Sequence, residues 1–360
     1  MTNLIRKNIL EITPYIPGKP IEEVRRQLGL REIIKLASNE NPLGASPRAL
    51  GAIKKALAGI NRYPDGSCFY FKNALAKNFR LKPENFICAN GSDELIDIII
   101  KTFVEEDEEI ITSDVTFLEY GIISRINKRK IITAPLRYFK YDLEAIKSRV
   151  NKKTKLIFIS NPNNPTGTYV TSFEVEDFLK DLPEDVVVVF DEAYDLFVDV
   201  DDFPKSLTYL DKKNIIILKT FSKSFGLAGL RVGFAITKPE FIQSMDKARP
   251  PFNVNTLAQV AGIAALEDKK FLKKTKEIIL KEKDYLYNSL ANSGIPYTPT
   301  VANFILIDVG KDGLNVFREM LKFGVIVRDM QQYGLKNFIR VTIGTHKENE
   351  RFIKVLKKVL

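Results

Sequence analysis

Short runs of apolar residues alternate along the chain with longer stretches in which apolar positions recur every three or four residues. This alternation is typical of an α/β fold, in which buried strands form a largely parallel sheet between layers of helices. The runs at 155–160, 185–190 and 214–220 are almost continuously apolar, as expected of strands that are covered on both faces. A fourth run, at 232–237, predicts a further strand.

Helical spacing of apolar residues predicts helices at 46–57, at 92–103 and from Asp268 to Ala291. We expect Ser92 to cap the second helix, because a serine hydroxyl accepts hydrogen bonds from the unpaired N–H groups of a first turn. The chain changes character near 248–255, where a double proline ends whatever helix precedes it.

A second, smaller α+β domain is expected beyond this break, because a helix-rich stretch is followed there by new apolar runs. Its strands are predicted at 302–309, 325–330 and 338–344. The chain is therefore expected to have three parts: an N-terminal arm and helix associated with the small domain, a large domain and a small C-terminal domain, at 1–45, 46–250 and 251–360.

The charge balance is basic, since 55 lysines and arginines against 45 aspartates and glutamates give a formal charge of +10. Such an excess can signal nucleic acid, a membrane surface or anionic small molecules as partners. Here the charges are interspersed along the chain and form no basic tail, so we expect them to coat helices as solvated faces. No nucleic-acid or membrane partner is predicted.

Histidine and cysteine are scarce, with His346, Cys68 and Cys88 as the complete set. A multi-histidine or thiolate metal site is therefore excluded, and a Ser-His-Asp triad could use only His346. General acid–base chemistry must come from Lys, Tyr, Asp or Glu. The chain has no signal-peptide core at its start and no apolar run of about 18 residues, so a cytoplasmic protein is expected.

The segment 220–234 follows a predicted strand and carries Lys223. Ligand-binding loops of α/β sheets lie beyond the carboxyl ends of strands, which suits this lysine for chemistry. Thr220, Ser222 and Arg231 supply hydroxyls and a guanidinium, the groups that cradle a phosphate. An isolated lysine would be interpreted as a solvated surface residue. Next to these phosphate-binding groups, Lys223 is better explained as a residue that forms a Schiff base.

Two further strand ends carry polar side chains. Asp191 directly follows the strand at 185–190, and Tyr194 comes three residues later. Asp191 could be a helix N-cap. Alternatively, its carboxylate pairs with a protonated pyridine nitrogen, whose charge lets the ring accept electrons from a substrate Cα–H bond. Asn164 lies in the turn-forming segment 160–168, where its amide can hydrogen-bond the ring oxygen of such a pyridine cofactor.

In this order, the three segments resemble the class I and II aminotransferases, which have fold type I and use pyridoxal 5′-phosphate. More closely, the chain resembles the histidinol-phosphate aminotransferases over essentially its whole length. The segments that carry this resemblance are PYIPGKPIEEVRRQLG (14–29), KLASNENPLG (35–44), NRYPDG (61–66), GSDELI (91–96), FSKSFGLAGLRVG (221–233), PFNVN (251–255), ANF (302–304), VRDMQQYGL (327–335) and RVTIGT (340–345). The resemblance implies a large cofactor-binding domain, with a mostly parallel central sheet flanked by helices, and a smaller α+β domain.

The resemblance also implies a role for each matched residue around the cofactor. Lys223 holds the cofactor covalently and moves the proton at the substrate Cα, while Asp191 pairs with the ring nitrogen. Tyr194 and Asn164 contact the ring oxygen, and Phe117 stacks on the pyridine face. The residues implied to bind the cofactor phosphate, partly through amides at a helix N-terminus, are Ser92, Asp93, Thr220, Ser222 and Arg231.

Substrate binding is implied in the same way. Arg340 and Arg328 bind the anionic end of the substrate. Asn41 contributes to the substrate site, and Tyr15 covers its entrance. Arg328 could instead form an ion pair with Asp329 at a strand edge. Arg340 lies inside an otherwise apolar strand, where a buried charge needs a partner.

In this family the residue at Tyr63 is supplied by the partner subunit to the cofactor phosphate, which implies a homodimer with composite sites. The chain departs from the family at one point. The family usually has Pro-Thr before the aromatic stacking residue, and here the segment is Val115-Thr116-Phe117. That loop position is tolerant, so we expect activity to be retained.

The reaction implied by the resemblance is a two-stage exchange between small anionic amino donors and 2-oxo acids. L-Histidinol phosphate and 2-oxoglutarate would give imidazole acetol phosphate and L-glutamate, a step of histidine biosynthesis. Alternatives with the same fold are an aromatic aminotransferase and a phospho-amino-acid decarboxylase. A non-catalytic regulator would need an added DNA-binding module. Only about 40 residues precede the SNENPLG segment, fewer than the smallest usual independent domain.

Overall fold

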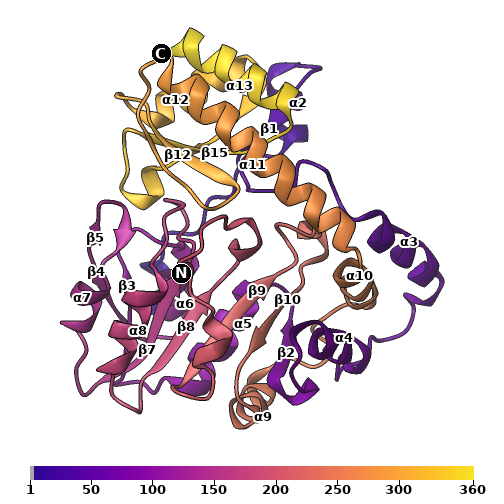
Figure 1. Ribbon diagram of the computed structural model, residues 1–360, viewed down its shortest axis with the longest axis vertical. Helices are drawn as coiled ribbons and strands as arrows, with labels where there is room; N and C mark the ends of the chain where they lie inside the picture. Colours follow the sequence, from indigo (N-terminus) through magenta and orange to yellow (C-terminus); the bar gives the residue numbers. More distant parts are fainter. Residues whose placement is uncertain (1–3) are drawn as a thin grey trace.

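The computed structural model describes residues 4–360 and consists of two bodies (Figure 1). The large body, below in this view, is built on a seven-stranded sheet, and the small body above it is built on a four-stranded sheet. Among residues 4–360, no helix combines the length and the apolar character needed to cross a membrane.

The large sheet has the strand order β2-β10-β9-β8-β7-β3-β4, and the five neighbouring strands from β9 to β4 run parallel. Strand β10 runs antiparallel to both of its neighbours. The strands are β2 (Phe86–Ala89), β3 (Glu109–Ser113), β4 (Lys130–Ala134), β7 (Thr154–Ser160), β8 (Val187–Asp191), β9 (Ile215–Thr220) and β10 (Gly233–Ile236). The predicted α/β fold with a mostly parallel sheet is confirmed.

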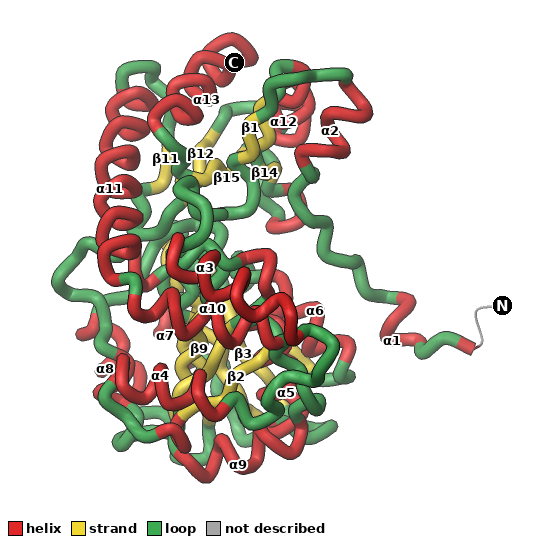
Figure 2. The backbone as a smooth tube through the Cα atoms, turned by 90° about the vertical axis from the view of Figure 1, so that its right-hand side faces the viewer, coloured by secondary structure: helices red, strands yellow, loops and turns green. Residues whose placement is uncertain are grey.

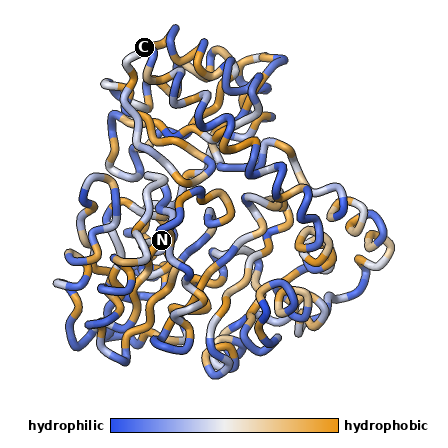
Figure 3. Tube along the Cα trace, viewed as in Figure 1, coloured by the Kyte–Doolittle hydropathy of each residue, from blue (hydrophilic) through white to orange (hydrophobic). Residues whose placement is uncertain are grey.

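Both faces of this sheet are covered, as the apolar runs predict. In β7, Ile157 and Ile159 face one hydrophobic cluster, whereas Leu156 and Phe158 face another. Figure 3 shows hydrophobic residues concentrated along these central strands. Helices of the first cluster are α3 (Pro47–Ala56), α4 (Phe69–Phe79), α7 (Leu143–Lys147), α8 (Ser172–Lys180) and α10 (Thr256–Glu267). Helices of the second cluster are α5 (Ser92–Phe103), α6 (Leu118–Ile126) and α9 (Pro239–Ala248). A short hairpin, β5 (Leu136–Arg137) and β6 (Lys140–Tyr141), lies beside them.

The small body has an antiparallel sheet in the order β11-β12-β15-β14. Its elements are α11 (Lys269–Ala291), β11 (Tyr297–Thr298), β12 (Phe304–Asp308), α12 (Gly313–Lys322), β13 (Val325–Ile326), β14 (Arg328–Asp329), β15 (Phe338–Thr342) and α13 (His346–Val359). The single strand predicted at 325–330 is two strands, because β13 pairs with the N-terminal arm and β14 pairs with β15.

The N-terminal arm lies along both bodies (Figure 2). Its helix α2 (Ile21–Leu28) buries Val24 in the small-body core, and β1 (Ile34–Lys35) pairs in parallel with β13. At the other end, α1 (Lys7–Leu10) reaches the large body, where Asn8 donates a hydrogen bond of 2.8 Å to the carbonyl of Arg125.

Helix α10 packs within the large body although it follows the double proline. It shares a hydrophobic cluster with α3 and α4, and a β-carbon on Gly262 would lie 2.7 Å from Cε2 of Phe71. Leu272 in α11 still packs on this cluster, whereas Ile279 belongs to the small-body core. We therefore propose that the domain boundary lies in the first turns of α11 rather than at residue 250.

Ser92 is not the N-cap of α5, so this prediction is wrong by one residue. The helix begins at Ser92, and Gly91 is its N-cap with φ 90° and ψ 172°. Glycine adopts this conformation without strain, and a β-carbon there would lie 2.6 Å from Nη2 of Arg231. The turn places Ser92 in the first helical turn, where its backbone N–H group has no partner within the helix.

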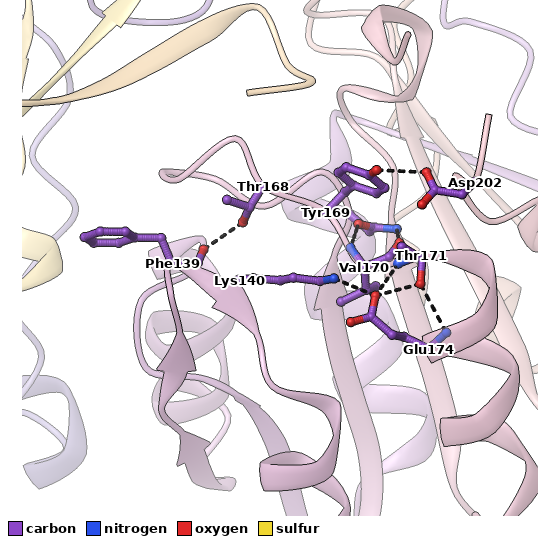
Figure 4. A network of polar contacts seen from close by, with 9 residues as sticks. Phe139, Lys140, Thr168, Tyr169, Val170, Thr171, Glu174 and Asp202 are labelled. Atoms are coloured by element: carbon purple, nitrogen blue, oxygen red, sulfur yellow. Dashed lines mark hydrogen bonds and ion pairs between the residues drawn. The ribbon is translucent and has the colours of Figure 1, made fainter. Parts of the chain in front are cut away.

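The loop between β7 and α8 is held in place by side-chain hydrogen bonds (Figure 4). The hydroxyl of Thr168 donates to the carbonyl of Phe139 (2.7 Å), and that of Tyr169 donates to Asp202 (2.8 Å). Thr171 and Glu174 form a capping box at the start of α8. Glu174 also forms an ion pair with Lys140 of the β5–β6 hairpin. On the other side, the carbonyl of Gly167 accepts from the backbone N–H of Val301, so the loop also contacts the small body.

We expect Gly167→Ala to lower the free energy of unfolding more than Gly294→Ala does. Both glycines have positive φ, 76° and 65°, so each substitution has a backbone cost of about 1–2 kcal/mol. A β-carbon on Gly167 would lie 2.0 Å from Oγ1 of Thr300, whereas one on Gly294 would meet nothing within 4 Å. Urea unfolding measures both losses, and equal losses would contradict the tight contact between loop and small body.

Candidate active site

A cavity of about 300 Å³ lies at the carboxyl ends of the parallel strands, between the two bodies. The ends of β7, β8 and β9, the starts of α5 and α6, the N-terminal arm and β15 all contribute to its lining. It brings together most of the residues predicted from the sequence: Tyr15, Ser92, Asp93, Phe117, Asn164, Asp191, Tyr194, Thr220, Ser222, Lys223, Arg231 and Arg340.

Three predicted site residues do not line the cavity: Tyr63, Asn41 and Arg328. Tyr63 is 83% exposed, and its ring stacks on Phe252 with centroids 4.8 Å apart. Asn41 is buried, and its amide donates to the carbonyl of Ser224 at 2.8 Å. Asn41 therefore supports the backbone next to Lys223, and its role in substrate binding stays a prediction.

Lys223 follows β9, and its Nζ donates to the carbonyl of Ser38 at 3.1 Å. Burial lowers the pKa of Lys223 to about 8, and the positive charge of Arg340 adds to this effect. A substantial fraction of this amine is therefore neutral near physiological pH. Since the neutral form is the nucleophile, Lys223 is suited to attack a carbonyl carbon.

Lys219, four residues earlier in β9, has the opposite character. Burial alone would lower its pKa, but the carboxylates of Asp195 (2.5 Å) and Glu192 (2.7 Å) outweigh burial and raise it. Lys219 therefore stays protonated. Its ion pairs tie β9 to the segment after β8, which carries Asp191 and Tyr194.

The carboxylate of Asp191 is buried at the end of β8, where it accepts two hydrogen bonds. They come from the hydroxyl of Tyr120 (2.7 Å) and from the backbone N–H of Ala193 (3.2 Å). Burial raises the pKa of Asp191 to about 6, and both hydrogen bonds oppose this shift. Asp191 is therefore mostly ionised at neutral pH. No helix begins at Asp191, so the N-cap interpretation does not apply.

The side chains of Tyr194 and Asn164 complete this side of the cavity. Burial raises the pKa of Tyr194 to about 12, so its hydroxyl stays a hydrogen-bond donor while it accepts from Nδ2 of Asn39 at 3.0 Å. The side-chain oxygen of Asn164 accepts from the guanidinium of Arg340. The predicted stacking residue Phe117 precedes α6, and its ring contacts that of Tyr120 edge-on, at 5.6 Å between centroids.

The opposite end of the cavity is suited to a phosphate group. Arg231 donates to Asp93 (3.0 Å) and to Oγ of Ser222 (3.4 Å) above the first turn of α5. The hydroxyl of Thr220 accepts from the backbone N–H of Ser222 at 3.1 Å. A guanidinium, two hydroxyls and the N-terminus of a twelve-residue helix together form an anion cradle.

Arg328 and Arg340 lie directly opposite each other on β14 and β15, and both are buried. Arg328 donates to the side-chain oxygen of Gln332, and Arg340 donates to Asn164 and to the carbonyl of Ala37. Among residues 4–360, no carboxylate, including that of Asp329, forms an ion pair with either guanidinium. Two buried like charges in register destabilise a sheet, so an anionic ligand would stabilise this arrangement.

Among the residues that were not identified from the sequence, Ser38, Asn39 and Tyr120 form hydrogen bonds with predicted site residues. Asn39 lies in the family-like segment 35–44 with a positive φ of 55°, which an asparagine in a turn motif could have suggested. Tyr120 gave no signal, because a tyrosine three residues after Phe117 is typical of an ordinary helix core.

Residues 31–356 match the family described as aminotransferase class I and II. The chain is 47% identical over 357 residues to a histidinol-phosphate aminotransferase of Moorella thermoacetica, covering 99% of this chain and 92% of that protein. A protein of the same name from Caldicellulosiruptor saccharolyticus is 43% identical over 358 residues, with 99% and 100% covered. The crystal structure of histidinol-phosphate aminotransferase from Sinorhizobium meliloti, in complex with pyridoxal-5′-phosphate, superimposes with a TM-score of 0.90. It is 28% identical, with 99% of this chain and 97% of that chain covered.

In the cofactor-free protein, reductive methylation with formaldehyde is expected to modify Lys223 at a lower pH than most lysines. The neutral amine is the reactive form, so the reactivity of Lys223 should rise as the pH passes about 8, whereas an ordinary lysine has a pKa of about 10.4. Lys219 is the matched control, because burial also acts on its amine but two carboxylates hold it protonated, and it should resist modification. Mass spectrometry across this pH range gives both profiles. Similar pH profiles for Lys219 and Lys223 would contradict the prediction that the amine of Lys223 loses its proton near pH 8.

Proposed function

The chain belongs to the aminotransferase class I and II family, and we propose that it transfers an amino group from L-histidinol phosphate to 2-oxoglutarate. The products are imidazole acetol phosphate and L-glutamate, and the location is the cytoplasm. One observation carries this proposal: the amine of Lys223, the carboxylate of Asp191 and the guanidinium of Arg340 line a single cavity. Relatives of 47% and 43% identity, each matched by 99% of this chain, support the choice of substrate.

Pyridoxal 5′-phosphate is the cofactor, as in the related Sinorhizobium meliloti structure. The residues present fit it, because the cavity has a nucleophilic amine for its aldehyde, a carboxylate for its ring nitrogen and an anion cradle for its phosphate. When bound, the cofactor supplies an aldehyde that takes up the amino group and a ring that accepts electrons released at the substrate Cα. The residues proposed to hold it are Ser92, Asp93, Phe117, Asn164, Asp191, Tyr194, Thr220, Ser222, Lys223 and Arg231.

Lys223 and Asp191 perform the proton chemistry in this proposal. The amine of Lys223 would take the proton from the substrate Cα and deliver it to the carbon that bore the cofactor's aldehyde, which its lowered pKa of about 8 permits at neutral pH. The ionised carboxylate of Asp191 keeps the ring nitrogen protonated. Tyr194, as a protonated phenol, donates to the ring oxygen.

The two buried arginines bind the anionic end of each substrate. The planar fork of a guanidinium matches both a carboxylate and a phosphate, so one pocket accepts glutamate and a phosphate ester. Arg340 lines the cavity, and Arg328 lies behind it with its guanidinium 5.1 Å from the ring centre of Tyr15. Because the amino group is held on the enzyme between half-reactions, the kinetics are ping-pong.

The proposal includes a homodimer in which Tyr63 reaches the cofactor phosphate of the partner subunit. Tyr63 lies between α3 and α4, a region that also exposes several large apolar side chains. These are Leu50, Leu57, Ile60, Phe69 and Tyr70, together with Phe252, whose ring stacks on that of Tyr63. An exposed apolar surface of this kind supports a protein–protein interface.

A panel of amino donors tests the proposed substrate. We expect turnover of L-histidinol phosphate that requires 2-oxoglutarate and has a higher kcat/KM than turnover of phenylalanine. A preference for phenylalanine would indicate an aromatic aminotransferase, and turnover with CO₂ release but no 2-oxoglutarate would indicate a decarboxylase. The same panel with Arg340→Ala should show kcat/KM lower by about tenfold or more for both histidinol phosphate and glutamate, with the cofactor still bound. Equal kcat/KM values in wild type and variant would exclude the proposal that Arg340 binds both substrates.

Mixing two inactive variants tests the composite site. Lys223→Ala and Tyr63→Ala alone are expected to have little activity. When the two are unfolded and refolded together, a mixed dimer combines both defects in one site and leaves the other site intact. Transamination should therefore reappear above the level of either variant refolded alone. If mixing restores nothing although mixed dimers form, Tyr63 acts within its own subunit or not at all.

A further inference from the structure

Tyr120 lies in the first turn of α6, directly behind two residues that face the cavity. Its hydroxyl donates to Oδ2 of Asp191 at 2.7 Å, and its ring meets that of Phe117 edge-on. The other face of the ring stacks on Phe158 of β7, with centroids 4.6 Å apart and planes 6° apart. Tyr120 thus touches both the carboxylate assigned to the cofactor nitrogen and the ring assigned to the cofactor face.

This tyrosine has little freedom to move. It is fully buried, and the stack on Phe158 fixes the direction of its C–O bond. Burial also keeps the pKa of Tyr120 well above its usual range, so the hydroxyl remains a donor at every physiological pH. A rigid donor aimed at a carboxylate holds that carboxylate in one orientation.

The charges around Asp191 make this donor important. Burial is the main cause of the raised pKa of Asp191, and the negative charges of Asp93 in α5 and of the adjacent Glu192 add to it. Among residues 4–360, Tyr120 provides the one side-chain hydrogen bond to the carboxylate, and the backbone of Ala193 provides the other bond. Hydrogen bonds to the charged form favour ionisation, so the hydrogen bond from Tyr120 lowers the pKa of Asp191 and counteracts the effect of the surrounding carboxylates.

We propose that Tyr120 is a positioning residue whose hydroxyl keeps the Asp191 carboxylate ionised and oriented, and whose ring sets the plane of Phe117. The inference rests on the proposed function, since it assumes that Asp191 faces the ring nitrogen of pyridoxal phosphate. One proton is shared between that nitrogen and the carboxylate. With Tyr120 present the carboxylate is the weaker base, and the proton stays on nitrogen. Without the hydroxyl, the proton shifts from nitrogen to the carboxylate oxygen.

The holoenzyme tests this directly. The protein is reconstituted with pyridoxal phosphate that carries ¹⁵N in its ring, and the ¹⁵N chemical shift reports the protonation of that nitrogen. In wild type we expect the shift of a protonated ring, and in Tyr120→Phe a displacement towards the unprotonated value. The kcat of this variant should fall about tenfold or more, with KM for the amino donor changed by about twofold or less.

Tyr209→Phe is the matched control, because it removes another buried hydroxyl of the large body, one that faces Glu176. Its ¹⁵N shift should equal that of wild type. Replacement of Tyr120 by 3-fluorotyrosine retains the ring and makes the hydroxyl a stronger donor, so the nitrogen should stay protonated to a higher pH. This second variant decides the question even where Tyr120→Phe folds poorly.

The outcomes separate the two claims. If wild type holds the cofactor with a protonated nitrogen, and neither Tyr120→Phe nor the fluorinated variant alters the ¹⁵N shift, the positioning role is wrong and the proposed function stands. If wild type does not bind pyridoxal phosphate, both are wrong.

Discussion

The site depends on the amine of Lys223, which forms no ion pair with a carboxylate among residues 4–360. Lys219 lies inside β9 and Lys223 lies three residues beyond the end of that strand, and burial acts to lower the pKa of both. Lys219 meets Glu192 and Asp195 and stays charged, whereas Lys223 meets a backbone carbonyl and the positive charge of Arg340. Proximity in the chain therefore does not make the two lysines alike in protonation. The neighbouring charges set the difference, and they come from both bodies of the molecule.

The fold supplies those neighbours through its topology. Parallel strands present their carboxyl ends at one edge of the sheet, so β7, β8 and β9 place the Asn164 loop, Asp191 and Lys223 side by side. The small body contributes Arg340 from β15 and reaches the same edge. Tyr120 and Lys219 do not line the cavity. Tyr120 donates a hydrogen bond to Asp191, and the ion pairs of Lys219 link β9 to the segment after β8. The reactive groups are thus held by contacts that lie outside the cavity.

Much of this could be predicted from the sequence, because its signals are local. Continuous apolar runs located β7, β8 and β9 to within two residues, and helical spacing located α3, α5 and α11 equally well. Polar residues just after those strands gave Asp191 and Lys223, and resemblance to a family supplied Arg340 and Phe117. The remaining features depend on distant contacts. The N-cap at Gly91 follows from the approach of Arg231, the position of α10 follows from packing on α3 and α4, and the contact of Tyr120 with Asp191 joins residues 71 positions apart.

We propose that pyridoxal phosphate is linked covalently to Lys223. Borohydride reduction of the purified holoenzyme, followed by digestion and mass spectrometry, locates that link. We predict a phosphopyridoxyl group on Lys223, with Lys219 unmodified and the visible absorbance lost on reduction. A stable label on any other lysine, or no label in protein saturated with the cofactor, would contradict the assignment of Lys223 and the function built on it.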